Sequence, residues 1–361
     1  MSRVLPNRIF SGKYKYGHVQ GIAVDTARGF VYYSFTTAFI KTDMLGNMIG
    51  SVDNLVGHLG CITYDAQRNA VYGSLEYKND GIGAGISRRA GVTTPCENCF
   101  YLAVFDVDKI IRENMNAETD GVMKAVYLSC VVDDYMSVDE LSGKMHRYGC
   151  SGIDGVALGP EFGDSNADNP RIMIAYGIYG DVERNDNDNQ VIVQLDRSDI
   201  DKYALPLSQG APHHSGPEKC EKKYFFHTGN TTYGVQNLEY DPFLGVWLVA
   251  VYKGKKEQFS NFSMFVIDGK CRPEYGAVIG REGEYGYLLM SAQIGEKGEK
   301  DGKWGSYFLY GSTGIAALGD GYYYFSQKGY IKEEGMHFST VVKYKYEENS
   351  KDLFCVVEEQ E

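Results

Sequence analysis

The chain has 361 residues, 43% of them hydrophobic and 23% charged, as in a soluble protein with a sizeable core. Its 48 acidic residues outnumber 36 basic ones, and the formal net charge of −12, with no dense basic stripe, argues against nucleic-acid binding. No apolar run approaches the roughly 20 residues of a membrane helix. Residues 1–17 also lack the apolar stretch of a secretory signal, so we expect a cytoplasmic protein.

The residue types favour β structure. There are 29 Tyr, 17 Phe and 43 Gly against 9 Pro, and aromatic residues suit pleated strands while glycine suits tight turns. The clearest helix signal covers 106–115, about two turns long. Eight cysteines in a chain of this length do not resemble a disulfide framework, so reduced thiols are expected.

A short unit recurs five times along the chain. Each copy has an aromatic residue or Val, then Gly, a small or polar residue and a short apolar strand; the copies span 16–25, 56–65, 148–159, 233–241 and 310–319. A polar turn and a more aromatic second strand follow each copy, for example "RGFVYYSF" and "GYYYFSQ", and then a third strand. Fourth strands are expected at 47–52, 124–132 and 352–359.

Four-stranded antiparallel units repeated around an axis form a β-propeller. Five copies therefore predict an all-β, five-bladed propeller, a single domain over 1–361 with blades starting near 17, 57, 149, 234 and 311. The first spacing, 40 residues, is close to a minimal blade, whereas the next spacings of 92, 85 and 77 place long loop insertions in blades 2–4. Residues 7–11 could close the ring by joining the last blade, or the C-terminal strand could complete it alone.

The repeat resembles the β-propeller superfamily, in particular bacterial repeats with a "GIAVD…VYYS" first hairpin. This resemblance implies the blade geometry and no particular substrate. In propellers the inner strands line a central channel, and the loops that enter them share one face with the loops joining second and third strands. We call this the channel-mouth face. Both loop classes carry the insertions here, so a small-molecule site is expected on this face.

The repeat alignment brings specific side chains to the channel mouth. Before the repeat glycine stand Tyr16, Tyr148, Tyr233 and Tyr310, which could contact a ligand or pack between blades. One step deeper are Gln20, Asp154 and Gln236, polar groups that are costly to bury without a partner. The insertions add Glu76, Tyr179, Glu183 and Arg184, a mixture that suits a polyhydroxylated ligand.

Four of these positions are candidates for chemistry. His18 and His58 are equivalent on adjacent blades, and could shuttle protons, hold a divalent ion such as zinc or calcium, or cap their own blades. Asp154 and Glu239 lie on neighbouring inner strands and could form the carboxylate pair of a glycosidase, unless Glu239 points into the sheet interface.

Three other motifs are incomplete. "PCENC" (95–99) has the spacing of a metal or redox site, but no further ligands follow at similar spacing. Cys220 or the His213–His214 pair could complete a zinc site only if the fold happened to bring them there, so cysteines without a role are expected. "DSNADN" (164–169) matches half of a calcium loop and is interpreted as a polar turn. "GAGISRRAG" (83–91) is interpreted as a flexible lid.

Two hypotheses for function remain. The first is binding or processing of a small molecule, a carbohydrate, at the channel mouth, with a glycoside hydrolase-like enzyme as one form. The second is a non-catalytic propeller that binds a protein partner. If the insertions at 76–100 and 178–189 fold over His18, His58 and Asp154, the first is favoured. The oligomeric state and the presence of catalysis stay open.

Overall fold

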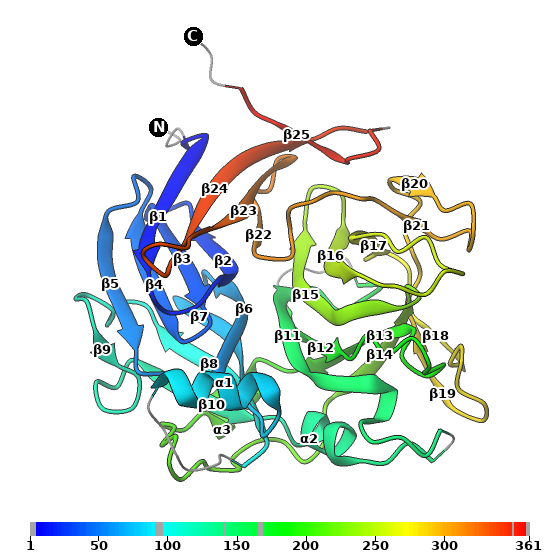
Figure 1. The fold of residues 1–361 in the computed structure, drawn as a ribbon. Coiled ribbons are helices and arrows are strands. Elements are labelled where there is room, and N and C mark those ends of the chain that lie inside the picture. The colour runs from blue at the N-terminus through cyan, green and yellow to red at the C-terminus, as the bar shows by residue number, and fades with distance from the viewer. Residues whose placement is uncertain (1–4, 91–96, 141, 165–168, 349, 359–361) are drawn as a thin grey trace.

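The computed structural model describes residues 5–90, 97–140, 142–164, 169–348 and 350–358. Its strands form five mostly antiparallel blades around a ring, which confirms the predicted β-propeller (Figure 1). Successive inner strands contact one another, and the inner strand of blade 5 contacts that of blade 1, so the ring is closed. In the described part of the chain, no helix is long and apolar enough to cross a membrane.

Blades 1 and 2 have the expected four antiparallel strands. Blade 1 consists, from the channel outward, of β2 (Val19–Asp25), β3 (Phe30–Phe35), β4 (Ala38–Asp43) and β5 (Met48–Asp53), with the short β9 (Met115–Asn116) added in parallel. Blade 2 consists of β6 (His58–Asp65), β7 (Ala70–Tyr77), β8 (Cys99–Asp106) and β10 (Met123–Tyr127).

Blade 3 has more than the expected four strands, and blade 4 has fewer. Blade 3 comprises β11 (Cys150–Gly159), β12 (Arg171–Ile178), β13 (Asn189–Leu195) and β14 (Lys222–His227), extended by β19 (Tyr285–Leu288) and β18 (Glu274–Ala277). Blade 4 has three strands, β15 (Thr231–Asp241), β16 (Val246–Lys253) and β17 (Met264–Asp268). Isolated bridges from Ser306 and Ser291 pair with β17, and β20 (Glu296–Lys297) and β21 (Trp304–Gly305) form a separate hairpin.

Blade 5 uses both ends of the chain. Its strands β22 (Ile315–Ala317), β23 (Tyr322–Ile331) and β24 (Met336–Tyr346) are joined by β1 (Arg8–Tyr14) and β25 (Phe354–Val356). β1 pairs with β24 from Val342 to His337, and β25 pairs with it from Tyr344 to Tyr346. The two closures that the sequence left as alternatives are therefore used together (Figure 1).

The recurring Asp at the end of the repeat explains the first turn of three blades. The side chains of Asp25, Asp65 and Asp241 accept backbone N–H groups two or three residues later, at 2.9–3.4 Å. Asp side chains that bond their own turn in this way favour the turn over continued strand. The second strand of each of these blades therefore pairs antiparallel with the first.

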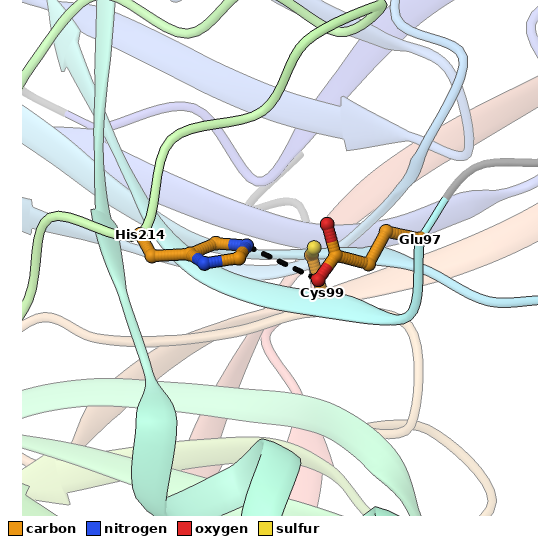
Figure 2. Close-up of side chains that lie close together, drawn as sticks. All are labelled: Glu97, Cys99 and His214. Carbon is orange, nitrogen blue, oxygen red and sulfur yellow. Dashed lines mark ion pairs between the residues drawn. The ribbon is translucent and has the colours of Figure 1, made fainter.

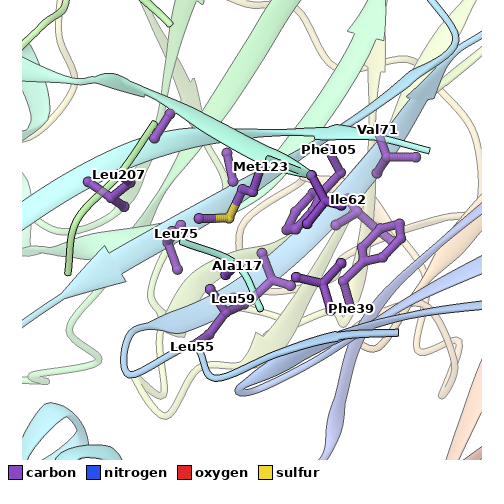
Figure 3. Close-up of a cluster of buried hydrophobic side chains, with 14 of the residues drawn as sticks. Phe39, Leu55, Leu59, Ile62, Val71, Leu75, Phe105, Ala117, Met123 and Leu207 are labelled. Carbon is purple, nitrogen blue, oxygen red and sulfur yellow. The ribbon is translucent and has the colours of Figure 1, made fainter. Parts of the chain in front are cut away.

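Apolar side chains fill the spaces between blades. The cluster between blades 1 and 2 includes Phe39 of β4 and Phe105 of β8, whose rings stack with centroids 4.5 Å apart (Figure 3). Such aromatic pairs add about 0.5–1.5 kcal/mol beyond the burial of their area. Similar clusters lie between the other blades, so neighbouring blades hold the inner strands in fixed positions.

The predicted helix at 106–115 is wrong. Residues after β8 form a turn, in which Lys109 N–H bonds Asp106 O, and Ile110 packs into the cluster between blades 1 and 2. The helices lie in the insertions: α1 (Gly81–Ala90), α2 (Ser129–Met136) and α3 (Ser198–Tyr203). The segment expected as a lid at 83–91 is thus helical as far as Ala90, and the strand expected at 124–132 ends at Tyr127, before α2.

Candidate functional site

Polar side chains from four blades form a connected chain in the channel. The amide Nε2 of Gln20 lies 3.0 Å from His18 Nε2 and 2.8 Å from His58 Nε2. His58 Nδ1 in turn lies 3.7 Å from Asp154 Oδ1, and Gln236 Nε2 donates to Asp154 Oδ2 at 3.1 Å. The deeper polar ring expected from the repeat alignment therefore converges, with His58 and Asp154 at its centre.

A buried ion pair lies behind His58. Glu76 Oε1 is 3.4 Å from His58 Nδ1 and 2.6 Å from Lys78 Nζ, and Glu76 Oε2 accepts the Ile153 N–H at 3.0 Å. Lys78 also donates to Ser151 O at 2.7 Å. Gly152 makes this approach possible, because its φ is +124° and a Cβ there would stand 2.1 Å from Glu76 Oε2.

The surroundings shift the pKa values of Glu76 and Asp154 in opposite directions. Burial opposes the ionisation of Glu76, but the charges of Lys78 and His58 hold its pKa below the usual range. Burial and the neighbouring Glu76 raise the pKa of Asp154 to about 7, against the opposing influence of His58 and Lys78. Glu76 is therefore ionised at neutral pH, whereas Asp154 exchanges a proton there.

The same groups act on His58. Burial disfavours its cation, yet the hydrogen bond to Glu76 and the charge of Asp154 raise its pKa above the usual value. His58 and Asp154 are thus two proton-exchanging groups in electrostatic contact, with an ionised Glu76 behind them.

Glu239 occupies a different place. Its Oε1 accepts the Ala317 N–H of β22 at 2.8 Å, and burial, together with the charge of Asp241, raises its pKa to about 8. Asp154 instead interacts with His58, Glu76 and Gln236. The carboxylate that acts on Asp154 is therefore Glu76, which sequence reasoning had assigned to ligand binding.

An open cleft lies on the channel-mouth face, and Gln236 links its backbone to Asp154. It encloses about 420 Å³, within the range of small-molecule sites, and is lined by Tyr179, Gly180, Asp181, Arg184, Thr232, Tyr233 and Lys255. Tyr233 is 41% exposed and has a left-handed φ of +61°. Its carbonyl accepts from Gln236 Nε2 at 2.9 Å, so one amide joins the backbone of the cleft to Asp154.

The insertion after β7 folds over His58. Ile82, Gly83, Ile86 and Ser87 of α1 surround a cavity with His58 and Glu76, but it encloses only about 10 Å³. That volume holds at most about one water molecule. Tyr179 OH donates to Asp80 Oδ2 at 3.4 Å, which links this insertion to the one after β12. The insertions therefore cover His58 and leave the open cleft at Tyr179 and Tyr233.

Three other predicted ligand contacts, Arg184, Tyr148 and Tyr310, have structural partners, although Arg184 also lines the cleft. Arg184 is buried, 2.6 Å from Asp186, and donates to Met145 O and His146 O, which orders its loop. Glu183 is exposed next to it. Tyr148 is buried, donates to Glu284 and lies below Arg281, and Tyr310 packs edge-on against Phe308. The contacts of Tyr148 and Tyr310 correspond to the packing alternative for the repeat tyrosines.

Sequence reasoning missed Lys78 and Lys255. Lys78 follows Glu76 by two positions, the spacing that places two side chains on one side of a strand, so a signal for the pair was present. Lys255 lies in an irregular loop after β16, where no periodicity points to a site.

The candidate metal ligands fall at two places. The point between His18 and His58 is taken by the Gln20 amide. Among the described residues, one group of three metal-ligating side chains gathers within 4.8 Å, namely Glu97, Cys99 and His214 (Figure 2). Cys96 of the 95–99 motif and residues 165–168 of the 164–169 motif lie outside the described residues. All cysteines within those residues are free thiols.

Comparisons with known proteins add little. No family model and no curated protein matches the chain. Among solved structures, a GH43 β-1,3-galactosidase with galactodeoxynojirimycin matches at TM-score 0.42 and 12% identity, covering 94% of this chain and 93% of that one. The Escherichia coli soluble aldose sugar dehydrogenase matches at 0.39 and 9%, covering 93% and 99%.

Kuenenia stuttgartiensis hydrazine synthase matches at TM-score 0.37 and 10% identity over 85% of this chain, which spans only 61% of that one. All three TM-scores lie below 0.5, so these matches carry no argument about function.

Proposed function

We propose that the protein binds a small polyhydroxylated ligand, a carbohydrate, in the cleft on the channel-mouth face, with Asp154 as the proton-exchanging group linked to it through Gln236. The observation that carries this proposal is the link from Asp154 through Gln236 to the Tyr233 carbonyl. It connects an open cleft of ligand size to a carboxyl group whose pKa is raised to about 7.

The cleft lining suits such a ligand. Tyr179 and Tyr233 offer flat apolar rings with polar tips, which can pack on the C–H faces of a sugar while accepting or donating hydrogen bonds. Asp181 and Lys255 are exposed at the same cleft and supply an acceptor and a donor for hydroxyl groups. Asp181 also pairs with Lys144 at 3.0 Å, so its position is constrained.

The proton chemistry belongs to Asp154. A group that is partly protonated at neutral pH can serve as general acid or general base. Glu76 is already held by Lys78 and the Ile153 N–H, so it acts on Asp154 through its charge and is not free to attack a substrate. If the protein hydrolyses a glycoside, Asp181 is the carboxylate at the cleft that supplies the second group.

The test is a binding screen followed by calorimetry. Thermal shift over a panel of neutral mono- and disaccharides should identify a ligand, and Tyr233→Ala should abolish its binding. Tyr307→Ala is the matched control, because Tyr307 has the same 41% exposure but lies outside the cleft lining. Asp154→Asn should remove the change in affinity between pH 6 and 8. No shift with any sugar, or equal losses in both tyrosine variants, would contradict the proposal.

One observation favours the alternative of a protein-binding propeller. The β18–β19 hairpin on the outer side of blade 3 exposes Tyr275, Ile279 and Tyr285, and the two tyrosine rings stack 6.3 Å apart. Exposed apolar patches commonly mark interaction surfaces. Under this alternative, a Tyr275→Ala, Tyr285→Ala double variant loses concentration-dependent self-association in sedimentation equilibrium while sugars have no effect on the wild type.

A further inference from the structure

A mixed group of side chains gathers where β8 begins. Cys99 is the first residue of β8 and Glu97 lies two residues before it. His214 comes from the segment 204–221, which follows α3 of blade 3 and runs along blade 2. His214 Nε2 is 3.2 Å from Glu97 Oε1, and the thiol, imidazole and carboxylate ligand atoms all lie within 4.8 Å of one another (Figure 2).

Contacts other than the Glu97–His214 pair hold His214 there. The Tyr101 hydroxyl donates to His213 O at 2.6 Å, and the Tyr127 N–H donates to Ser215 O at 2.8 Å. The Tyr127 ring stacks on the imidazole with centroids 4.6 Å apart and 28° between planes. Cys99 is fully buried within β8. Both chain segments of the site are therefore held in place before any ligand arrives.

The geometry points to a zinc site. We propose that Glu97, Cys99 and His214 bind one Zn²⁺ ion, with the fourth position taken by water. Tetrahedral zinc with bonds of about 2.0–2.3 Å places neighbouring ligand atoms about 3.3–3.6 Å apart. The observed 3.2 Å between nitrogen and oxygen matches this spacing, and the sulfur lies within 4.8 Å of both atoms.

The ligand types select the metal. Thiolate and imidazole favour zinc over calcium and magnesium, which take oxygen ligands. Without a metal, an exposed His–Glu pair contributes about 0–1 kcal/mol, and a buried thiol needs no charged neighbours. The convergence of a third, soft donor on that pair is what zinc binding explains. The site lies on different residues from the sugar cleft, so it does not depend on the proposed function.

Zinc at this position would join two blades. The segment 204–221 is already hydrogen-bonded to β8 and β10, for example through Ala125 and Leu205, and a metal at Cys99 would add a further attachment to blade 2. Because metal that binds only the folded state stabilises it, zinc should raise the midpoint of unfolding. Binding should weaken as pH falls, since the thiol and imidazole must be deprotonated.

The experiment titrates Zn²⁺ into chelator-treated full-length protein against a chromophoric zinc indicator. One equivalent should bind to the wild type. His214→Gln and Cys99→Ser should weaken binding at least about 100-fold, and the neighbouring His213→Gln, the matched control, by less than about 3-fold. Co²⁺ should give a thiolate charge-transfer band in the wild type that Cys99→Ser removes.

His214 is exposed enough that His214→Gln should fold normally, so it decides the matter even if Cys99→Ser does not fold. Failure to bind one equivalent overturns the proposal. So does binding that His214→Gln leaves within 3-fold of wild type, or that His213→Gln reduces equally.

Discussion

Replacing Glu239 by Gln should stabilise the protein, and the gain should grow with pH. Burial raises the pKa of this carboxyl to about 8 from its ordinary 4.5, so the folded state binds the proton more tightly than the unfolded chain. Stability contributed by the protonated group is therefore lost as pH rises from 4.5 to 8. Gln does not titrate, and its carbonyl can still accept the Ala317 N–H.

The size of the expected stabilisation follows from the pKa shift of Glu239. At pH 7 the carboxyl lies 7 − 4.5 = 2.5 pH units above its ordinary pKa, which corresponds to about 3 kcal/mol at 1.36 kcal/mol per unit. Above pH 8 the full 3.5 units correspond to about 5 kcal/mol. Part of the Glu239 surface stays accessible to solvent, so both figures are upper limits.

The assay is urea denaturation of wild type and Glu239→Gln at pH 5, 7 and 8.5, with the exposed Glu183→Gln as control. The difference should be small at pH 5 and increase to pH 8, whereas the control should stay within about 0.5 kcal/mol throughout. A constant loss of stability at every pH would refute the reasoning. It would show that folded Glu239 is ionised, and would return it to the catalytic candidates.

Three further substitutions test the scaffold. Lys78→Met leaves the buried Glu76 carboxylate without its cation and should cost about 3–5 kcal/mol at pH 7 in urea denaturation; the loss should shrink by pH 4, where protonated Glu76 needs no cation. Gly152→Ala places a Cβ against Glu76 and should lower the free energy of unfolding by about 1–3 kcal/mol and weaken sugar binding. An unchanged melting temperature would contradict this prediction. Ile9, in β1, is 2% exposed, so Ile9→Ala should lower the free energy of unfolding by about 2–5 kcal/mol. An unchanged free energy of unfolding would mean that the N-terminal strand contributes nothing to stability.

The inner strands could be predicted from the sequence because the repeat places similar turn-forming residues at both ends of each strand. A Gly before the strand and an Asp after it recur at the same turns, as at Asp25 and Asp65, so equivalent positions could be aligned. Aligning the repeats was enough to predict that Gln20, Asp154 and Gln236 lie close together, since inner strands converge on one channel. The insertions carry no repeat, and there the secondary-structure predictions failed, at α1 and α2.

The helix α1 shows why. Its sequence is rich in Gly, the poorest helix former after Pro, so propensity argued against a helix. The Asp80 side chain nevertheless caps its first turn by accepting the Ile82 and Gly83 N–H groups at 3.0 and 2.8 Å. α2 was missed for another reason, because a short apolar run fits a strand and a helix equally well. The cleft depends on such insertions, so its lining could not be derived in full.

Gln20 gives a final test of the proton chemistry in the channel. Its one amide group faces His18 and His58 together, donating to both when their Nε2 atoms carry no proton. When His58 is protonated, its Nε2 becomes a donor, and the Gln20 carbonyl must turn toward it. Gln20→Leu removes that acceptor and should lower the pKa of His58, which Glu76 and Asp154 raise in the wild type. An NMR titration of the His58 ring measures this. An unchanged midpoint would mean that the carboxylates alone set the proton affinity of His58, and that the amide serves only to fill the space between the two imidazoles.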